Sequence, residues 1–362
     1  FRISSGVEHT RRILLLELVD RDGPSVWAEC VATALPNYTP ECVDTAWLAI
    51  REWLAPRLLG RDIHAPHDVH RILATNIRGH NMAKAALEMG CWGLAAEAQR
   101  VPLCTLLGGT RDRVPTGISL GIQPKPELLV ERARAAVDAG YKKVKLKIQP
   151  TQDVAYVKAV RAALGPDVEI MADANAAYTI ADADLLASLD EFDLLMLEQP
   201  LGADDLIPLA ALQKRMRTPL CLDESITDVN RARDMIALGS GKIINIKPGR
   251  VGGFTASIAV HDVARDAGIP VWCGGMLESG IGRAYNVALA SLPNFSLPGD
   301  LSPSARYWAR DVVEPAWTME ADGMVRVPVG VPGIGVRVDA EMIESITTRH
   351  EVLTSRRAAV AV

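Results

Sequence analysis

The chain has 362 residues, a formal net charge of −5 at pH 7, 23% charged residues and 49% hydrophobic residues. This ordinary globular composition gives no reason to expect nucleic acid or an anionic membrane surface as a partner, and no apolar run is long enough to span a bilayer. A (β/α) barrel needs about 250 residues, so the length predicts a second domain of roughly 100 residues beside one.

The six cysteines form no CxxC pair and lie scattered through apolar segments. Buried free thiols in a reducing cytosol are the expected state, so the chain is predicted to be cytoplasmic. No signal peptide is visible, and the sequence opens at Phe1 within a predicted strand without an initiator methionine, which suggests a longer natural N-terminus.

The first part of the chain predicts a small α+β domain. Residues 1–30 contain two strand-like runs separated by the turn sequence DRDGPS. Helical periodicity follows over residues 43–59 and again over 82–100. We expect residues 1–108 to form this N-terminal domain.

The rest of the chain predicts a barrel. The run TGISLGI is expected to be the first barrel strand, and residues 129–139 the first barrel helix, with Gly140 ending it. The last barrel strand is expected near residues 295–300. The barrel is assigned to residues 109–310, and the Gly- and Pro-rich segment 311–362 is expected to return to the first domain.

A repeated unit between these ends points to one functional site. Short apolar runs close on Lys147, Asp173, Glu198, Asp223 and Lys247, at intervals of 24 to 26 residues. Each unit predicts a buried strand followed by an amphipathic helix, which is the βα repeat of a parallel barrel. Because barrel active sites lie at the carboxyl ends of the strands, these five charged side chains are expected to converge.

Three of the five residues suit a metal ion. Asp173, Glu198 and Asp223 end consecutive strands with no histidine or cysteine nearby. A set of carboxylate oxygens favours a hard cation, with Mg²⁺ as the leading choice and Mn²⁺ as an alternative. Asn175 and Glu224 are placed to orient these ligands. The simpler interpretation, salt-bridged rim residues, is disfavoured by three acids in phase with two lysines.

The two lysines suit proton transfer. Lys147 and Lys247 end the second and sixth strands, on roughly opposite sides of an eight-stranded ring, so a metal-bound substrate carboxylate would hold its α-carbon between two amines. This predicts abstraction of a proton α to a carboxylate, giving a Mg²⁺-stabilised enolate. Lys145 shares a strand face with Lys147 and can polarise the bound carboxylate. Mg²⁺ and Lys145 are expected to lower the pKa of the lysine base.

The motifs VKLKI, ADANAAYT, LEQPL, TPLCLDES, NIKPGRVGG, VWCGGMLESGIGRA and LPGD resemble the enolase superfamily. Within it, the chain resembles the muconate lactonizing enzyme subgroup, and more narrowly the o-succinylbenzoate synthase / N-succinylamino acid racemase family. The resemblance covers nearly the whole chain. It implies an α/β fold, a (β/α)8-type (modified TIM) barrel with an α+β capping domain, and a homo-oligomer.

The resemblance also implies residue roles: metal ligation by Asp173, Glu198 and Asp223, and acid/base catalysis by Lys147 and Lys247. It implies substrate contacts from Ser119, Asn175 and the backbone around Gly275, Met276 and Leu277. Loops of the cap, Ser4–Gly6 and Asn37–Thr39, are expected to close over the site. The resemblance implies about twenty more residues before Phe1, so a first cap strand is expected to lie outside this sequence. At the position near Ser5, the resemblance leads us to expect a bulkier residue than the serine found in this chain.

Several activities remain open at the level of sequence. The first is a lyase, dehydrating 2-succinyl-6-hydroxy-2,4-cyclohexadiene-1-carboxylate to o-succinylbenzoate in menaquinone biosynthesis. The second is an isomerase, racemising N-succinylamino acids. Another enzyme of the muconate lactonizing type, a cycloisomerase or epimerase, is an alternative, although the eighth-strand region lacks the DxD feature of dipeptide epimerases. A Schiff-base aldolase using Lys247, and a non-catalytic binding protein, are less favoured.

Overall fold

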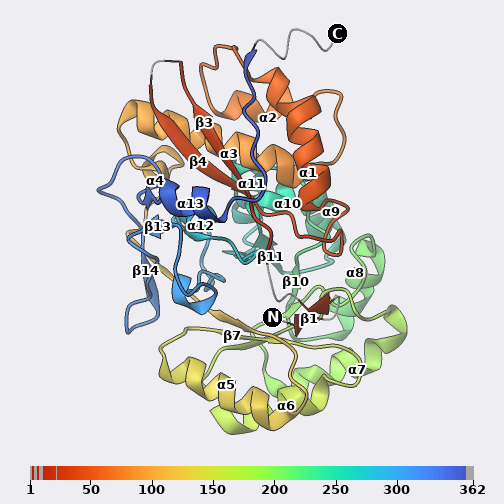
Figure 1. The fold of residues 1–362 in the computed structure, drawn as a ribbon. Helices are drawn as coiled ribbons and strands as arrows, with labels where there is room; N and C mark the ends of the chain where they lie inside the picture. Colours follow the sequence, from red (N-terminus) through yellow and green to blue (C-terminus); the bar gives the residue numbers. More distant parts are fainter. Residues whose placement is uncertain (1, 4–5, 8–10, 22, 356–362) are drawn as a thin grey trace.

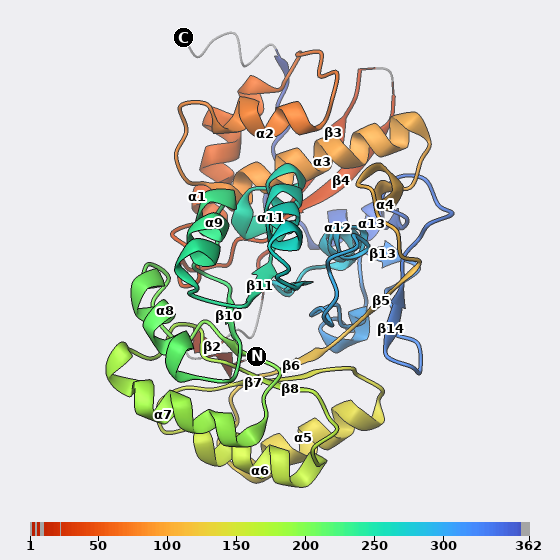
Figure 2. The same ribbon diagram turned by 180° about the vertical axis from the view of Figure 1, so that it is seen from behind.

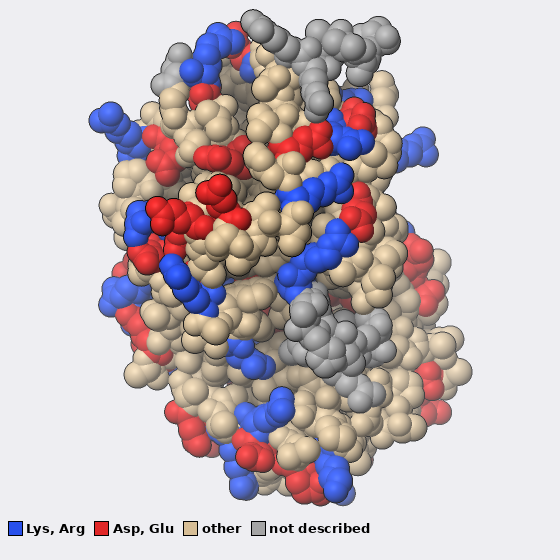
Figure 3. Space-filling model, in the orientation of Figure 1, with Lys and Arg blue, Asp and Glu red and all other residues tan. Residues whose placement is uncertain are grey.

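The computed structural model describes residues 2–3, 6–7, 11–21 and 23–355. The elements within residues 14–99 gather at one end of the molecule, and the helices of the first barrel units lie at the opposite end (Figures 1 and 2). The short antiparallel strands β1 (Arg2–Ile3) and β2 (Gly6–Val7) lie apart from the first group, toward the barrel. In the view of Figure 3, acidic and basic side chains are interspersed over the surface. Within the described residues, no helix is both long and apolar enough to cross a membrane.

The N-terminal part is a hairpin packed against helices. Strands β3 (Leu14–Val19) and β4 (Ser25–Cys30) pair antiparallel, from Leu14 opposite Cys30 to Val19 opposite Ser25. Helix α1 (Val43–Ala49) continues into a π-helical turn, η1 (Ile50–Leu54), and a 3-10 turn, η2 (Ala55–Arg57). Helices α2 (His67–Ala74) and α3 (Asn81–Gln99) complete it. The two strands and the two helical stretches expected from the sequence are therefore confirmed.

Helix α3 is held at its start by a buried carboxylate. Glu41 accepts hydrogen bonds from the backbone N–H groups of Met82 (2.8 Å) and Ala83 (3.1 Å), which have no partner within the helix. The alanine-rich side of α3 then packs closely on β4. A separate cluster of buried side chains forms the core of this part, and its members include Leu14, Val31, Ala46, Ile50, Leu54, Val69, Leu73, Met82, Leu87 and Met276.

The second part is a curled parallel sheet surrounded by helices. Its seven strands lie in chain order: β6 (Ile118–Leu120), β7 (Val144–Lys147), β8 (Ile170–Asp173), β9 (Leu197–Glu198), β10 (Leu220–Leu222), β11 (Ile243–Ile246) and β12 (Val271–Cys273). Every residue of these strands is buried, because helices cover the outside and side chains fill the inside. This explains why the runs are almost wholly apolar up to their charged ends.

The helices that follow the strands are α5 (Pro126–Asp138), α6 (Val154–Leu164), α7 (Ala183–Ser188), α8 (Leu206–Arg215), α9 (Val229–Leu238), α10 (Pro248–Val251), α11 (Phe254–Asp266) and α12 (Gly280–Ala290). The proline at the start of α5 has the preset backbone angle of a first helical residue. Gly140, just beyond its end, has φ +93°. Helices commonly end at a glycine in this left-handed conformation, so Gly140 ends the helix as the sequence predicted.

The eighth position of the barrel is filled by an irregular segment. Gly299 N donates to Pro115 O (3.0 Å) and Gly299 O accepts from Gly117 N (2.7 Å), while Asp300 N donates to Cys273 O (2.8 Å). The segment thus joins β12 to the chain entering β6 and closes the ring. The expected regular strand at 295–300 is wrong, since only an isolated bridge forms there. Pro298 has no N–H to give to a ladder.

The C-terminal part adds short strands and a helix. Strand β14 (Met324–Arg326) pairs with β5 (Arg113–Pro115), and β13 (Val313–Glu314) pairs with β15 (Arg337–Val338). Helix α13 (Ala340–Ile346) follows, and Leu353 packs against the N-terminal core cluster. The architecture is the expected (β/α)8-type barrel with an α+β cap, while the domain boundaries stay a prediction.

Candidate active site

The five charged residues at the strand ends meet inside the barrel. Parallel pairing sets Lys147 opposite Asp173, and Asp173 opposite Glu198. The side chains of Asp173, Glu198 and Asp223 are fully buried, and those of the two lysines are nearly so. Buried charges are costly unless they are paired, and the pairs found here divide into two groups.

The first group surrounds Asp173. Its Oδ2 lies 2.5 Å from Lys147 Nζ and 2.9 Å from Lys145 Nζ. Lys145 Nζ also lies 2.7 Å from Glu198 Oε2 and 3.2 Å from Asp300 Oδ2. Lys145 therefore points into the same site as Lys147, as the two-residue spacing predicted, and is more deeply buried. Asp300 belongs to the segment that closes the barrel.

The second group surrounds Asp223. Lys247 Nζ donates to Asp223 Oδ2 at 2.8 Å, and the Tyr38 hydroxyl donates to Asp223 Oδ1 at 2.8 Å. Arg250 donates to the same Oδ1 through Nη1. The Tyr38 ring centre lies 4.4 Å from Lys247 Nζ. The two lysines thus approach the carboxylates from different strands, each held by a different aspartate.

Two amide side chains and one further carboxylate surround these groups. Asn175 accepts from Lys147 Nζ (2.7 Å) and donates to Glu224 Oε1 (3.1 Å). Asn175 itself has φ +44°, a left-handed conformation in which its backbone N–H reaches Asp173 Oδ1. Asn245 donates to Glu198 Oε1 at 2.7 Å. Asn175 and Glu224 therefore lie beside the carboxylates, where the sequence placed them.

Burial and neighbouring carboxylates raise the pKa of two acidic side chains at the site. Burial, and then the neighbouring Asp173 carboxylate, raise the pKa of Glu198 to about 8. Burial and the Asp223 carboxylate likewise raise the pKa of Glu224 to about 7. For Asp173, burial is outweighed by Lys145 and Lys147, which hold its pKa below the usual range. An additional cation among these oxygens would relieve the repulsion.

The donor set fits a hard divalent cation. Asp173, Glu198 and Asp223 offer only carboxylate oxygens from adjacent strands, which is the ligand type of Mg²⁺. In the part of the chain that the structure describes, no three acidic, histidine or cysteine side chains already surround one point as a metal site. In this structure Lys147 contacts Asp173 and Lys247 contacts Asp223.

The nearby carboxylates favour the charged form of two lysines at the site. Burial lowers the pKa of Lys247, but the attraction of Asp223 outweighs it, and the net pKa lies above that of a lysine in water. The same balance, with Asp173 and Asp300 as the leading attractions, raises the pKa of Lys145. The expectation that Mg²⁺ and Lys145 lower the pKa of the lysine base concerns the metal-bound site and stays a prediction.

The expected substrate-contacting residues lie on β6 and in the loop after β12. Ser119 is buried on β6, opposite Lys145 in register, and its hydroxyl has no hydrogen-bond partner among the described residues. Gly275, Met276 and Leu277 follow β12 in the loop before α12, and Leu277 has φ +57°. The Met276 side chain turns away into the core cluster of the cap.

The two cap loops expected over the site differ in what can be described. In Asn37–Thr39, Tyr38 reaches the barrel and contacts both Asp223 and Arg250. In Ser4–Gly6, Ser4 and Ser5 lie outside the described residues. Sequence reasoning gave no role to Tyr38, Arg250, Asn245 or Asp300. For Arg250 a signal existed, since it lies three residues after Lys247 in the motif NIKPGRVGG.

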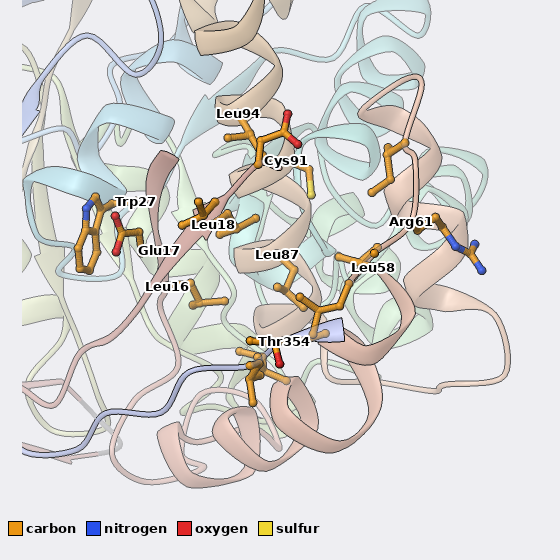
Figure 4. A pocket seen from close by; sticks show the side chains of 18 of the residues that line it. Leu16, Glu17, Leu18, Trp27, Leu58, Arg61, Leu87, Cys91, Leu94 and Thr354 are labelled. Carbon is orange, nitrogen blue, oxygen red and sulfur yellow. The ribbon is translucent and has the colours of Figure 1, made fainter. Parts of the chain in front are cut away.

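A cavity of about 980 Å³ lies elsewhere, within the N-terminal part. Figure 4 shows Leu16 and Leu18 of β3 and Leu87 and Leu94 of α3 turned into it, with Leu58 on the facing side. Its lining mixes aliphatic side chains with charged ones and includes residues 350–354, and none of the five rim residues contributes to it. Its size therefore says nothing about catalysis.

Comparison with known families covers nearly the whole chain. Residues 1–108 match the model of the mandelate racemase / muconate lactonizing enzyme N-terminal domain, and residues 128–342 match the enolase C-terminal domain-like model.

Individual relatives agree with this assignment. The chain is 48% identical to an o-succinylbenzoate synthase of Geobacillus kaustophilus, over 96% of this chain and 92% of that protein. It is 46% identical to an N-succinylamino acid racemase of an Amycolatopsis species, over 96% and 93% respectively. A solved enolase-superfamily structure from Listeria innocua superimposes with a TM-score of 0.91 at 38% identity, covering 97% of this chain and 95% of that one. The chain therefore belongs to the mandelate racemase / muconate lactonizing enzyme family of the enolase superfamily.

Proposed function

We propose that this protein is an o-succinylbenzoate synthase, an N-succinylamino acid racemase, or both, acting on a small-molecule carboxylate through removal of its α-proton. The observation that carries the proposal is the placement of Lys147 and Lys247 on opposite flanks of one buried carboxylate group, against Asp173 and Asp223. Relatives at 46–48% identity over most of the chain bear one or the other name, which supports both reactions.

The residues proposed to hold the metal are Asp173, Glu198 and Asp223. Enzymes of this family generally depend on Mg²⁺, and the oxygen-only donor set also accepts Mn²⁺. When bound, such an ion supplies positive charge where the substrate carboxylate becomes more negative. Asn245, Asn175 and Glu224 would keep the surrounding oxygens oriented.

The lysines carry the proton. In racemisation, one neutral lysine accepts the α-proton, the C–H electrons move into the substrate carboxylate, and the other lysine, protonated, returns a proton to the opposite face. In dehydration, Lys147 takes the α-proton and then gives it to the departing hydroxide, which leaves as water, while Lys247 serves as a cation. Lys145, which is more deeply buried, adds fixed positive charge near the developing oxyanion.

The proposal predicts measurable turnover of at least one substrate by the Mg²⁺-loaded protein. The values to compare are kcat/KM for dehydration of the cyclohexadiene carboxylate and for racemisation of N-succinylphenylalanine. A ratio strongly favouring dehydration assigns the enzyme to menaquinone synthesis, and a ratio near one or reversed assigns it an amino-acid role. Absence of both rates with Mg²⁺ and with Mn²⁺ would contradict the proposal. Activity that is insensitive to EDTA, together with borohydride trapping of a covalent adduct, would instead support an aldolase.

The proposal also covers the domain organisation, the oligomeric state and the cellular location of the protein. The chain is proposed to divide into a cap (1–108), a barrel (109–310) and a C-terminal segment (311–362) returning to the cap. The family match at 1–108 supports the extent of the cap, and the match at 128–342 covers most of the barrel and continues into the C-terminal segment. We also propose a homo-oligomer in the cytoplasm.

A further inference from the structure

A buried glutamate of the cap holds the start of a barrel helix. Glu29 lies on β4 with 1% of its surface exposed. Its Oε2 accepts three hydrogen bonds: from Ser279 N (3.0 Å), Ser279 Oγ (2.6 Å) and Gly282 N (3.2 Å). These groups open helix α12, whose first N–H groups have no partner within the helix.

The approach is close enough to require glycine at one position. A Cβ atom on Gly282 would lie 2.8 Å from Glu29 Oε2 and 2.8 Å from Glu278 Cβ. The chain therefore has no room for any other residue there unless a side chain moves. Strand β4 of the cap and the first turn of helix α12 are therefore in close contact.

The loop that precedes α12, residues 274–279, is fixed from two more directions. Met276 packs its side chain into the core cluster of the cap. Glu278 accepts from Met276 N (2.8 Å) and pairs with Arg283 (3.1 Å), which donates to Asp300 O (2.7 Å). Leu277, in the middle, has φ +57°, a conformation that costs a non-glycine residue energy and persists only where contacts enforce it.

We propose that Glu29 is a positioning residue, through which the cap holds the 274–279 loop in the conformation that binds the substrate. This rests on the proposed function, in which the backbone of Gly275, Met276 and Leu277 contacts substrate. Among the described residues, Glu29 makes no hydrogen bond or ion pair with Lys147 or Lys247, so its influence falls on binding rather than on proton transfer. Uniform loss of binding contacts raises KM and leaves kcat unchanged.

Another cap glutamate provides a matched control. Glu88 of α3 is also fully buried and also caps a barrel helix, accepting from Phe254 N (2.7 Å) and Thr255 N (3.0 Å) at the start of α11. It belongs to the same cap but has no contact with the 274–279 loop. Removing it tests what loss of a buried cap-to-barrel carboxylate does in general.

The test compares Glu29→Ala, Glu29→Gln and Glu88→Ala at about pH 8, above the pKa of Glu29, which burial raises to about 7. Glu29→Ala is expected to raise KM about tenfold with kcat within about threefold of the wild type. Glu29→Gln keeps one acceptor oxygen and should recover part of the loss. Glu88→Ala should lower thermal stability but leave KM unchanged. An unchanged KM in Glu29→Ala, or an equal rise in Glu88→Ala, would overturn the proposal.

A second measurement is independent of the substrate. Hydrogen–deuterium exchange of the backbone amides from Met276 to Gly282 should accelerate at least about tenfold in both Glu29 variants and not in Glu88→Ala. If the wild type turned over neither substrate, the proposed function would fail, but this exchange would still decide whether Glu29 holds the loop. If Glu29→Ala does not fold, Glu29→Gln carries both measurements, and exchange equal to the wild type would refute the positioning role.

Discussion

Replacing Lys247 by arginine should separate the two proposed reactions. Arginine keeps a positive charge beside Asp223 but does not give up its proton near neutral pH, so it cannot serve as a base. Racemisation needs proton transfer at both faces and is expected to fall roughly 10³-fold, within the range of a lost general acid–base group. Dehydration needs only a cation at this position and should keep a far larger share of its rate. Both rates are measured on one Mg²⁺-loaded preparation.

The matching variant is Lys147→Arg, which alters the other flank. Lys147 is the proposed base in both reactions, so both should fall roughly 10³-fold. Its contacts to Asp173 and Asn175 can be retained by a guanidinium, which limits structural damage. If Lys247→Arg lost both reactions equally, or if Lys147→Arg kept dehydration, the division of roles between the two lysines would be wrong.

Replacing Glu198 by glutamine is expected to abolish metal-dependent activity without weakening the metal-free fold. One of the three proposed carboxylate ligands becomes a neutral amide. Mg²⁺ affinity should therefore drop at least about 100-fold, which is more than is typical when a residue that only hydrogen-bonds to a metal ligand is removed. In the metal-free protein, burial and the neighbouring Asp173 raise the pKa of Glu198 to about 8, so at pH 7 this carboxyl is mostly neutral and a neutral amide of the same shape replaces it with little electrostatic change. The metal-free variant should therefore melt no lower than the metal-free wild type.

The measurement is thermal unfolding against Mg²⁺ concentration, beside the two activities. The wild type should gain stability with Mg²⁺, because an ion that binds only the folded state shifts the unfolding equilibrium. The Glu198→Gln variant should show no Mg²⁺-dependent gain in stability, and EDTA should abolish the activity of the wild type. The exposed Glu127→Gln is a control, since it lies on helix α5 away from the carboxylates. A Mg²⁺-dependent shift of normal size in Glu198→Gln would remove Glu198 from the ligand set.

Much of the barrel and its rim could be predicted because the signals are local. A parallel strand buried on both faces reads as a short apolar run, and the charge that ends it falls at the rim. The spacing of Lys147, Asp173 and Glu198 is therefore enough to predict from the sequence that the three side chains share one site. The segment closing the barrel was located but misassigned, because Pro298 interrupts the ladder that a regular strand would need.

Contacts between distant parts of the chain could not be predicted in the same way. Tyr38 comes from a loop 185 residues away from Asp223, and nothing in its local sequence indicates that contact. The elevated pKa of Lys247 likewise depends on a distance that no pattern encodes. A weaker signal did exist for Glu29 and Glu88, since each is an acid within an apolar run. A buried acid must find donors, although the sequence does not say where.

The most direct test of the central claim is exchange of the substrate α-proton with solvent. Each enantiomer of N-succinylphenylalanine is incubated with the Mg²⁺-loaded enzyme in D₂O, and loss of the α-proton signal is followed by NMR. If Lys147 and Lys247 face the α-carbon from opposite sides, both enantiomers should exchange in the wild type. Lys147→Ala and Lys247→Ala should each abolish exchange of a different enantiomer. If neither enantiomer exchanged in the wild type, or if both single variants lost exchange of the same one, the two-lysine account would be contradicted.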